Sequence, residues 1–263
     1  MGSAFDRKLQ VVIDKIRGKP RRSDPIGVFS VSPREALKRV RPSGGLEKLF
    51  YAHDGRTAIK WHHYLAIYDQ HFQSLRDRLG REPRILELGV SHGGSLQLWR
   101  KYFGPEARIV GVDIDPACID RVDPGSFVVI GDQTDPTVLA AAIERLGGGV
   151  DLIIDDGSHL GRHQIASFEY LCPRLSVHGL YACEDIQYCY SSEFEGGYRR
   201  DGTFVEYAKG LIDRLHAWHL DGELKTNFMD FARSTYGIFF YADLIVIEKR
   251  PIEMPFHVQM GKG

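Results

Sequence analysis

Hydrophobic residues between positions 84 and 183 form short continuous runs, and amphipathic stretches separate these runs. A continuous apolar run is typical of a strand that is buried on both faces of a sheet. Strands that alternate with helices favour a parallel sheet covered on both sides. The pattern predicts strands at about 84–90, 107–114, 126–130, 150–155 and 179–183, with helices at about 95–103, 136–146 and 162–175 between them.

The segments on either side of this region follow different patterns. Residues 60–79 carry aromatic and aliphatic side chains at helical spacing, which predicts a helix with one buried face. A polar loop at 186–202 and a helix at about 203–219 come after the last parallel strand. Two apolar runs, 236–241 and 244–248, are then too close together for a crossover helix, so we expect an antiparallel hairpin at the sheet edge.

The first 60 residues read as an N-terminal helical extension to a main domain at 61–263. Residues 19–25 are basic and rich in proline, which is typical of an exposed linker. Ser32, Pro33 and Glu35 are typical of a helix start, and that helix should stop before Pro42. The extension is either a surface appendage or a lid or oligomer contact near the active site.

The glycine-rich segment at 85–95 joins the first strand to its helix and marks the crevice where an open parallel sheet binds ligands. Gly89 permits a tight turn, and the helix that follows offers unpaired backbone N–H groups. Ser91 stands where a dinucleotide-binding turn has its second glycine, so a pyrophosphate would not approach closely. A donor without phosphates, S-adenosylmethionine, fits better than NAD.

Acidic residues stand at the end of every predicted parallel strand, and we expect them to meet at one edge of the sheet. Asp113 ends the second strand, where an acid accepts hydrogen bonds from ribose hydroxyls. Asp132 and Gln133 end the third, where an adenine edge would lie. The complete acidic set is Glu87, Asp113, Asp132, Asp155, Asp156, Glu184 and Asp185.

Three of these acids, Asp156, Glu184 and Asp185, end neighbouring strands and can converge on one ion. Carboxylates are hard oxygen ligands, so Mg²⁺ or a similar divalent cation is expected rather than zinc. His159 would lie one helical turn beyond Asp156 if a helix began there, close enough to act as general base. A structural hydrogen bond is the alternative for His159, and it is the favoured reading for His163.

The composition limits which partners and which cellular location the sequence predicts. The chain has 263 residues, of which 43% are hydrophobic, so it can form a sizeable core. Its formal charge of −1 gives no reason to expect a nucleic-acid partner. We expect neither a signal peptide nor a membrane span. The four cysteines form no Cys-x-x-Cys pair, which argues against a zinc or redox motif, and Cys172 and Cys183 stand in apolar context as expected of reduced core residues in a cytoplasmic protein.

Taken together, the motifs at 87–95, 111–115, 131–133, 154–159 and 184–185 resemble class I S-adenosylmethionine-dependent methyltransferases. Among these, the chain resembles the metal-dependent sugar O-methyltransferases of macrolide biosynthesis, the mycinamicin VI 2″-O-methyltransferase type. The resemblance implies a Rossmann-like α/β fold with five parallel strands and a terminal hairpin. It also implies Mg²⁺ at Asp156, Glu184 and Asp185 with His159 as proton acceptor. The cofactor-binding residues we then expect are Thr57, His62, Tyr64, Glu87, Gly89, Ser91, Asp113, Asp132, Gln133 and Asp155.

The expected reaction is methyl transfer to a hydroxyl of a glycosylated natural product such as an antibiotic, by a homo-oligomer (dimer or tetramer). Aromatic residues at 187–190 and 194–198 would wall the acceptor, unless that segment is a disordered surface loop. Three alternatives stay open: a methyltransferase for a catechol-like or other small phenolic acceptor, a nicotinamide-dependent dehydrogenase, and a non-catalytic adenosyl-binding protein.

Overall fold

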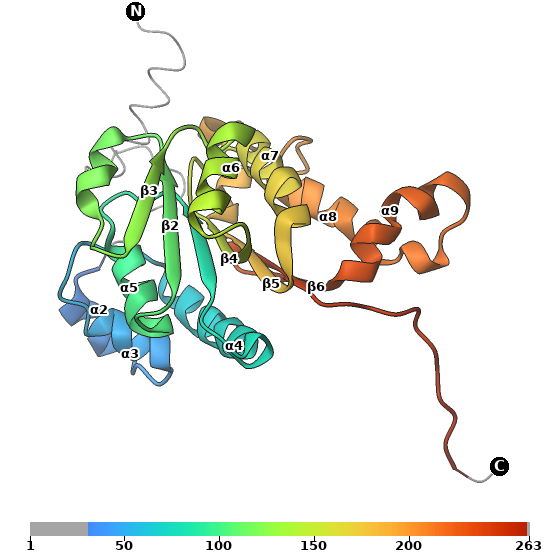
Figure 1. The fold of residues 1–263 in the computed structure, drawn as a ribbon, viewed down its shortest axis with the longest axis horizontal. Coiled ribbons are helices and arrows are strands. Elements are labelled where there is room, and N and C mark those ends of the chain that lie inside the picture. Colours follow the sequence, from blue (N-terminus) through green and yellow to red (C-terminus); the bar gives the residue numbers. More distant parts are fainter. Residues whose placement is uncertain (1–30, 262–263) are drawn as a thin grey trace, which may run out of the picture.

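The computed structural model describes residues 31–261, which build one mixed sheet between two layers of helices (Figure 1). The strand order is β3-β2-β1-β4-β5-β7-β6. The first five strands are parallel, and β7 runs antiparallel to both β5 and β6. The predicted five parallel strands and C-terminal hairpin are therefore confirmed. The strands are β1 (Arg84–Leu88), β2 (Arg108–Asp113), β3 (Ser126–Ile130), β4 (Val150–Asp155), β5 (Leu175–Cys183), β6 (Thr235–Tyr241) and β7 (Leu244–Lys249).

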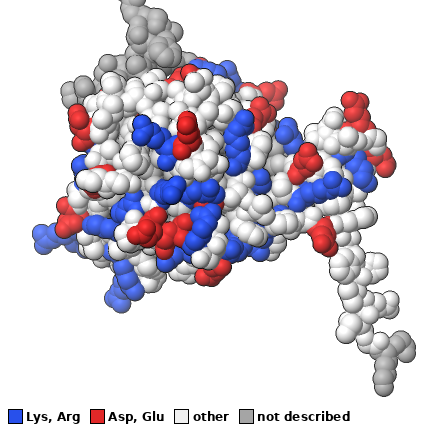
Figure 2. All heavy atoms as spheres, viewed as in Figure 1, with Lys and Arg blue, Asp and Glu red and all other residues white. Residues whose placement is uncertain are grey.

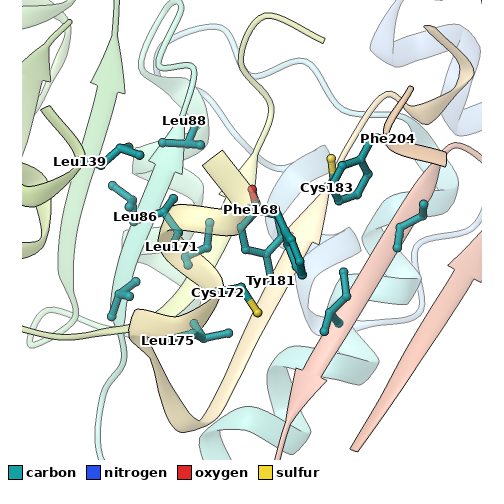
Figure 3. Packing of buried hydrophobic residues seen from close by; sticks show 14 of the residues in the cluster. Leu86, Leu88, Leu139, Phe168, Leu171, Cys172, Leu175, Tyr181, Cys183 and Phe204 are labelled. Carbon is teal, nitrogen blue, oxygen red and sulfur yellow. The ribbon is translucent and has the colours of Figure 1, made fainter. Parts of the chain in front are cut away.

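Two hydrophobic clusters lie on opposite faces of the sheet, because successive side chains of a strand point to opposite sides. Ile85 of β1 packs on one side with α3, α4 and α5, whereas Leu86 packs on the other with α6, α7 and α8. Figure 3 shows the second cluster, where Phe168 and Leu171 of α7 approach Tyr181 of β5. These helices are α3 (Gly45–Tyr51), α4 (His62–Leu79), α5 (Gly94–Phe103), α6 (Pro136–Arg145), α7 (Gly161–Leu171) and α8 (Phe204–Leu215).

Several boundaries differ from the prediction. Strand β5 begins at Leu175 rather than 179, because Leu175 pairs with Val150 before an irregularity in the ladder. Helix α9 (Gly222–Ser234), which the sequence did not predict, lies between α8 and β6, and only Ala232 of it is buried. The predicted linker at 19–25 lies outside the described residues.

The described part of the N-terminal extension packs against the main domain. Helix α2 (Pro33–Arg39) begins as predicted, with the Ser32 hydroxyl accepting from the backbone N–H of Glu35. In α3, Leu46 is fully buried and belongs to the cluster of α4 and α5. Asp69 of α4 accepts hydrogen bonds from the Gly45 N–H at 2.9 Å and from a tyrosine hydroxyl of α5. The division at residue 60 and the lid role stay predictions.

The surface and the cysteines agree with the composition. On the face drawn in Figure 2, acidic and basic side chains are interspersed, as the formal charge of −1 suggests. None of the described helices is long and apolar enough to cross a membrane. All four cysteines are buried and free, as expected of reduced core residues.

Asp151 ties the start of β4 to β1 and offers a test of the fold away from the site. Its buried carboxylate accepts hydrogen bonds from Arg81 and Arg84 at 2.9–3.0 Å. Although burial opposes ionisation, these partners hold the pKa of Asp151 well below its ordinary value. The ion pairs therefore stabilise the fold above about pH 4, and this contribution is lost as the pH falls towards the lowered pKa.

We expect Asp151→Asn to lower the free energy of unfolding by about 2 kcal/mol at pH 7, because the amide that replaces this buried carboxylate loses charge-assisted hydrogen bonds with Arg81 and Arg84. The difference between variant and wild type should shrink below pH 4. Urea unfolding at pH 7 and pH 3 measures both values, with the exposed Asp120→Asn as the control. A difference that is independent of pH would contradict this account.

Candidate active site

The turn after β1 is held against the turn after β4. Gly89 has φ +91°, and a methyl group added there would overlap the backbone carbonyl of Asp156. Gly93 (φ +79°) passes equally close to the carbonyl of Arg121. Because only glycine combines this backbone conformation with this approach, the turn brings the loops of two neighbouring strands into contact.

Asp113, at the end of β2, holds the same turn in place. Its Oδ2 accepts from the backbone N–H groups of Val90 and Ser91 at 2.8 and 3.0 Å, and its Oδ1 accepts from that of Asp115. The structure thus brings Asp113 and Ser91 together at the predicted crevice. A carboxylate oxygen accepts more than one hydrogen bond, so these contacts leave acceptor capacity for a ligand hydroxyl.

The predicted metal ligands and the predicted base lie together beyond the ends of β4 and β5. Asp156, His159 and Asp185 each offer a ligand atom, and these atoms lie within 4.8 Å of one another. His159 Nε2 is 3.5 Å from Asp185 Oδ2. The other oxygen of Asp185 accepts from Trp61 Nε1 at 2.9 Å, so this carboxylate is held from the side of α4.

Lys60, which the sequence analysis missed, joins this group. Its ammonium lies 2.7 Å from Asp156 Oδ2, 2.6 Å from Glu184 Oε1 and 3.7 Å from Glu87 Oε1. The Lys60 side chain is 1% exposed. Although burial alone would lower its pKa, the three carboxylates hold the pKa of Lys60 well above the ordinary value. The acids therefore do share a cation here, and it is an ammonium group of the chain.

Burial dominates the electrostatics of the two innermost acids. It raises the pKa of Glu87 to about 7, against the attraction of Lys60 and a hydrogen bond from the Ser95 hydroxyl at 2.8 Å. Burial and the nearby Asp156 also raise the pKa of Glu184, which accepts from the Tyr68 hydroxyl at 2.6 Å. The requirement that buried acids have a counter-charge predicts a basic side chain here, but it does not indicate which basic residue of the chain supplies it.

His159 lies in the loop before α7 and not on the helix itself, which corrects the helical placement considered from the sequence. Its φ is +57°, and α7 begins only at Gly161. The ring stacks on Tyr188 with a centroid distance of 5.3 Å, and Phe194 lies behind at 6.3 Å. The predicted aromatic wall is thus divided: Tyr188 and Phe194 are buried against His159, whereas Tyr190 and Tyr198 are exposed.

Two predicted cofactor contacts, Asp155 and Gln133, form an interior network instead of lining the acidic cluster. Asp155 accepts from the Tyr181 hydroxyl at 2.7 Å and from the Gln133 amide at 3.1 Å. Burial raises the pKa of Asp155 to about 6. Asp132 accepts from the backbone and hydroxyl groups of Thr134 in a local turn. The expectation that all strand-end acids face one crevice is therefore wrong for Asp155.

The three predicted contacts ahead of β1 lie in different surroundings. Thr57 borders the N-terminus of α5, where a methyl group on Gly94 would overlap its backbone. His62 is exposed, and its Nδ1 lies 3.0 Å from the Tyr51 hydroxyl. Tyr64 is fully buried; its hydroxyl donates to the Asp243 carbonyl and accepts from the Asp185 N–H. Tyr64 therefore supports the backbone beside a predicted metal ligand.

The donor set at this edge fits a hard divalent cation. Asp156 and Asp185 supply carboxylate oxygens near one another, and Glu184 is adjacent in sequence and shares Lys60 with Asp156. Magnesium prefers such oxygen ligands and keeps several waters or substrate oxygens in its shell. The Asp156 side chain is 25% exposed, so the group is open on one side.

Comparisons with known proteins find methyltransferases among the proteins most similar to this chain. The FtsJ-like methyltransferase family matches residues 56–181. A tetracenomycin-C rhamnosyl 2′-O-methyltransferase from Streptomyces olivaceus is 34% identical over 227 residues, covering 78% of this chain and 58% of that protein. The mycinamicin VI 2″-O-methyltransferase of Micromonospora griseorubida is 33% identical over 201 residues, covering 72% and 48% respectively. The chain thus spans about half the length of these curated relatives.

A solved structure supports the fold. The MycE methyltransferase of mycinamycin biosynthesis, in complex with Mg and SAH, superimposes with a TM-score of 0.63 at 29% identity, covering 80% of this chain and 56% of that one. A second MycE structure that also contains mycinamycin VI gives a TM-score of 0.64 at 26% identity, covering 88% and 67%. Both structures have the arrangement described above for the sheet and its helices. The chain has the class I S-adenosylmethionine methyltransferase fold, matches the FtsJ-like methyltransferases over residues 56–181, and is similar to O-methyltransferases named for the sugars of glycosylated natural products.

Proposed function

We propose that the protein transfers a methyl group from S-adenosylmethionine to a sugar hydroxyl of a glycosylated natural product, with the help of a divalent cation. The observation that carries this proposal is the grouping of Asp156, His159 and Asp185 within 4.8 Å beside the glycine turn. The named activities of the similar proteins support the sugar-bearing acceptor. The complexes of MycE with Mg and SAH support the two cofactors.

Each part of the site has a distinct task in this reaction. The turn at 89–93 and Asp113 would bind the donor, and Asp156, Glu184 and Asp185 would hold the cation. A bound divalent cation lowers the pKa of an acceptor hydroxyl. His159 would accept the proton of that hydroxyl, and Tyr188 and Phe194 would keep the imidazole in place. Holding both reactants in line contributes several kcal/mol to catalysis.

The chain's own chemistry supports two further parts of the proposal. All four cysteines are free, which suits a cytoplasmic enzyme. The formal charge of −1 favours a small-molecule acceptor over a nucleic acid. The homo-oligomer stays a prediction.

An acceptor panel tests the proposed substrate class. We expect methyl transfer to glycosylated polyketides with free sugar hydroxyls and none to the sugar position of the matching aglycones, which lack the accepting hydroxyl. For catechol, which keeps a hydroxyl but lacks the sugar, we expect at least about tenfold lower kcat/KM, because one lost binding contact accounts for a factor of that size. Transfer should be measured with radiolabelled donor in the presence of Mg²⁺. Catechol as the preferred acceptor would favour the phenolic alternative, and binding of NADH without binding of S-adenosylhomocysteine would favour the dehydrogenase.

A further inference from the structure

We propose that Lys60 is a positioning residue that acts as the built-in counter-cation of the acidic cluster. It would hold Asp156 and Glu184 together and weaken the affinity of the cluster for a divalent cation. The inference rests on the proposed metal site, and it concerns a residue for which neither the sequence motifs nor the reaction gives a role.

The contacts of Lys60 identify this role. Its ammonium is within 2.7 Å of oxygens on Asp156 and Glu184, which belong to the loops after two different strands. The same group is 3.7 Å from Glu87, which is fully buried on a third strand. The side chain is 1% exposed, so water contributes almost nothing to the neutralisation of these acids. A single cation therefore links the ends of β1, β4 and β5.

The position of Lys60 in the chain strengthens this linkage. The residue immediately precedes Trp61, whose indole N–H donates to Asp185. Trp61 is the N-cap of α4, a helix of 18 residues packed into the core. Two consecutive residues at the entry to α4 thus contact all three predicted metal ligands. Because the ligands are already neutralised and placed, an incoming cation meets a less negative site than three free carboxylates would form.

Lys60→Met tests the inference in the full-length protein. Without metal, in EDTA, the midpoint of thermal unfolding should fall by about 10 °C, because buried carboxylates lose their partner. Calorimetric titration with MgCl₂ should show at least about tenfold tighter binding than in the wild type, because a positive charge has left the site. A purely structural role would lower the midpoint and leave the Mg²⁺ affinity unchanged.

Three further variants control for the loss of the side chain. Lys60→Arg keeps the charge and should keep a wild-type Mg²⁺ affinity within about threefold, since the repulsion of a metal ion is conserved. Lys60→Met/Glu184→Gln removes both charges and should regain part of the lost thermal midpoint, because these neighbours are coupled. Lys101→Met removes an exposed ion pair with Asp54 and should change neither value.

The possible failures can be told apart. If the wild type binds Mg²⁺ and Lys60→Met binds it equally or more weakly, the inference is wrong and the proposed metal site stands. If neither protein binds Mg²⁺, the proposed metal site and the affinity part of the inference fall together. An unchanged thermal midpoint of Lys60→Met in EDTA, or a double variant no more stable than the single one, would also overturn the counter-cation role.

Discussion

Replacing His159 by alanine is expected to lower kcat for methyl transfer by about 10²–10⁴-fold, the usual contribution of a general base. The imidazole lies beside Asp185 and is held between the acidic cluster and the ring of Tyr188. It is therefore placed to accept a proton from a hydroxyl bound at the carboxylates. The affinity for S-adenosylhomocysteine should stay at the wild-type value, because the substitution leaves unchanged the turn after β1 that we propose binds the donor.

His163 provides the matched control for this variant. It lies on α7, and its Nδ1 is 2.9 Å from the Ser158 hydroxyl, which gives it a local structural contact. His163→Ala should keep kcat within about threefold of the wild type, in line with the small effects of substitutions outside a reacting group. Equal losses in the two variants would show that the His159 effect arises from the loop structure and not from proton transfer.

The second large effect is expected from Gly89→Ala, which should weaken S-adenosylhomocysteine binding by at least about 100-fold. Forcing the two loops apart misplaces binding groups by about 1 Å, which costs a factor of this size. The added methyl group overlaps the Asp156 carbonyl, so the turn that binds the donor and the loop that carries a predicted metal ligand must separate. Isothermal titration with S-adenosylhomocysteine measures the loss directly.

Gly80→Ala is the control that distinguishes the effect of this steric overlap from the conformational cost of placing alanine at a positive φ. Gly80 also has a positive φ, of +60°, but no atom lies within 4 Å of an added methyl group there. Both variants should therefore lose about 1 kcal/mol of folding free energy from backbone strain. Only Gly89→Ala should lose donor binding. Similar affinities in the two variants would mean that the contact between the two loops does not shape the site.

The succession of strands and helices along the chain could be predicted because it depends on local patterns. Continuous apolar runs give buried parallel strands, and the carboxyl ends of such strands meet at one edge. Of the three predicted ligands, Asp156 and Asp185 lie close together with His159 beside them, whereas the Glu184 carboxylate contacts Lys60. The hairpin followed from the short connection between 241 and 244, which leaves room for no other pairing.

A position at the end of a strand does not show on which face of the sheet an acidic side chain lies. Glu87 comes two residues after Ile85 in β1, so both side chains lie on the face of the sheet that α4 covers. Asp155 comes two residues after Ile153 in β4, so both lie on the opposite face, which α7 covers. Counting along each strand would have separated Asp155 from the cluster. Lys60 was missed for another reason: its partners are 27 to 124 residues away in the sequence, so no local pattern marks it.

We propose that the acids beyond β4 and β5 would bind a divalent cation that activates the hydroxyl to be methylated. The most direct test is the rate of methyl transfer to a sugar-bearing acceptor, measured on metal-stripped wild type and Asp156→Asn as MgCl₂ is added back. We predict that the wild type is inactive without metal and regains activity with added Mg²⁺, and that Asp156→Asn stays at least about tenfold slower at saturation, as lost metal contacts usually are. A variant as active as the wild type, with or without chelator, would contradict the claim.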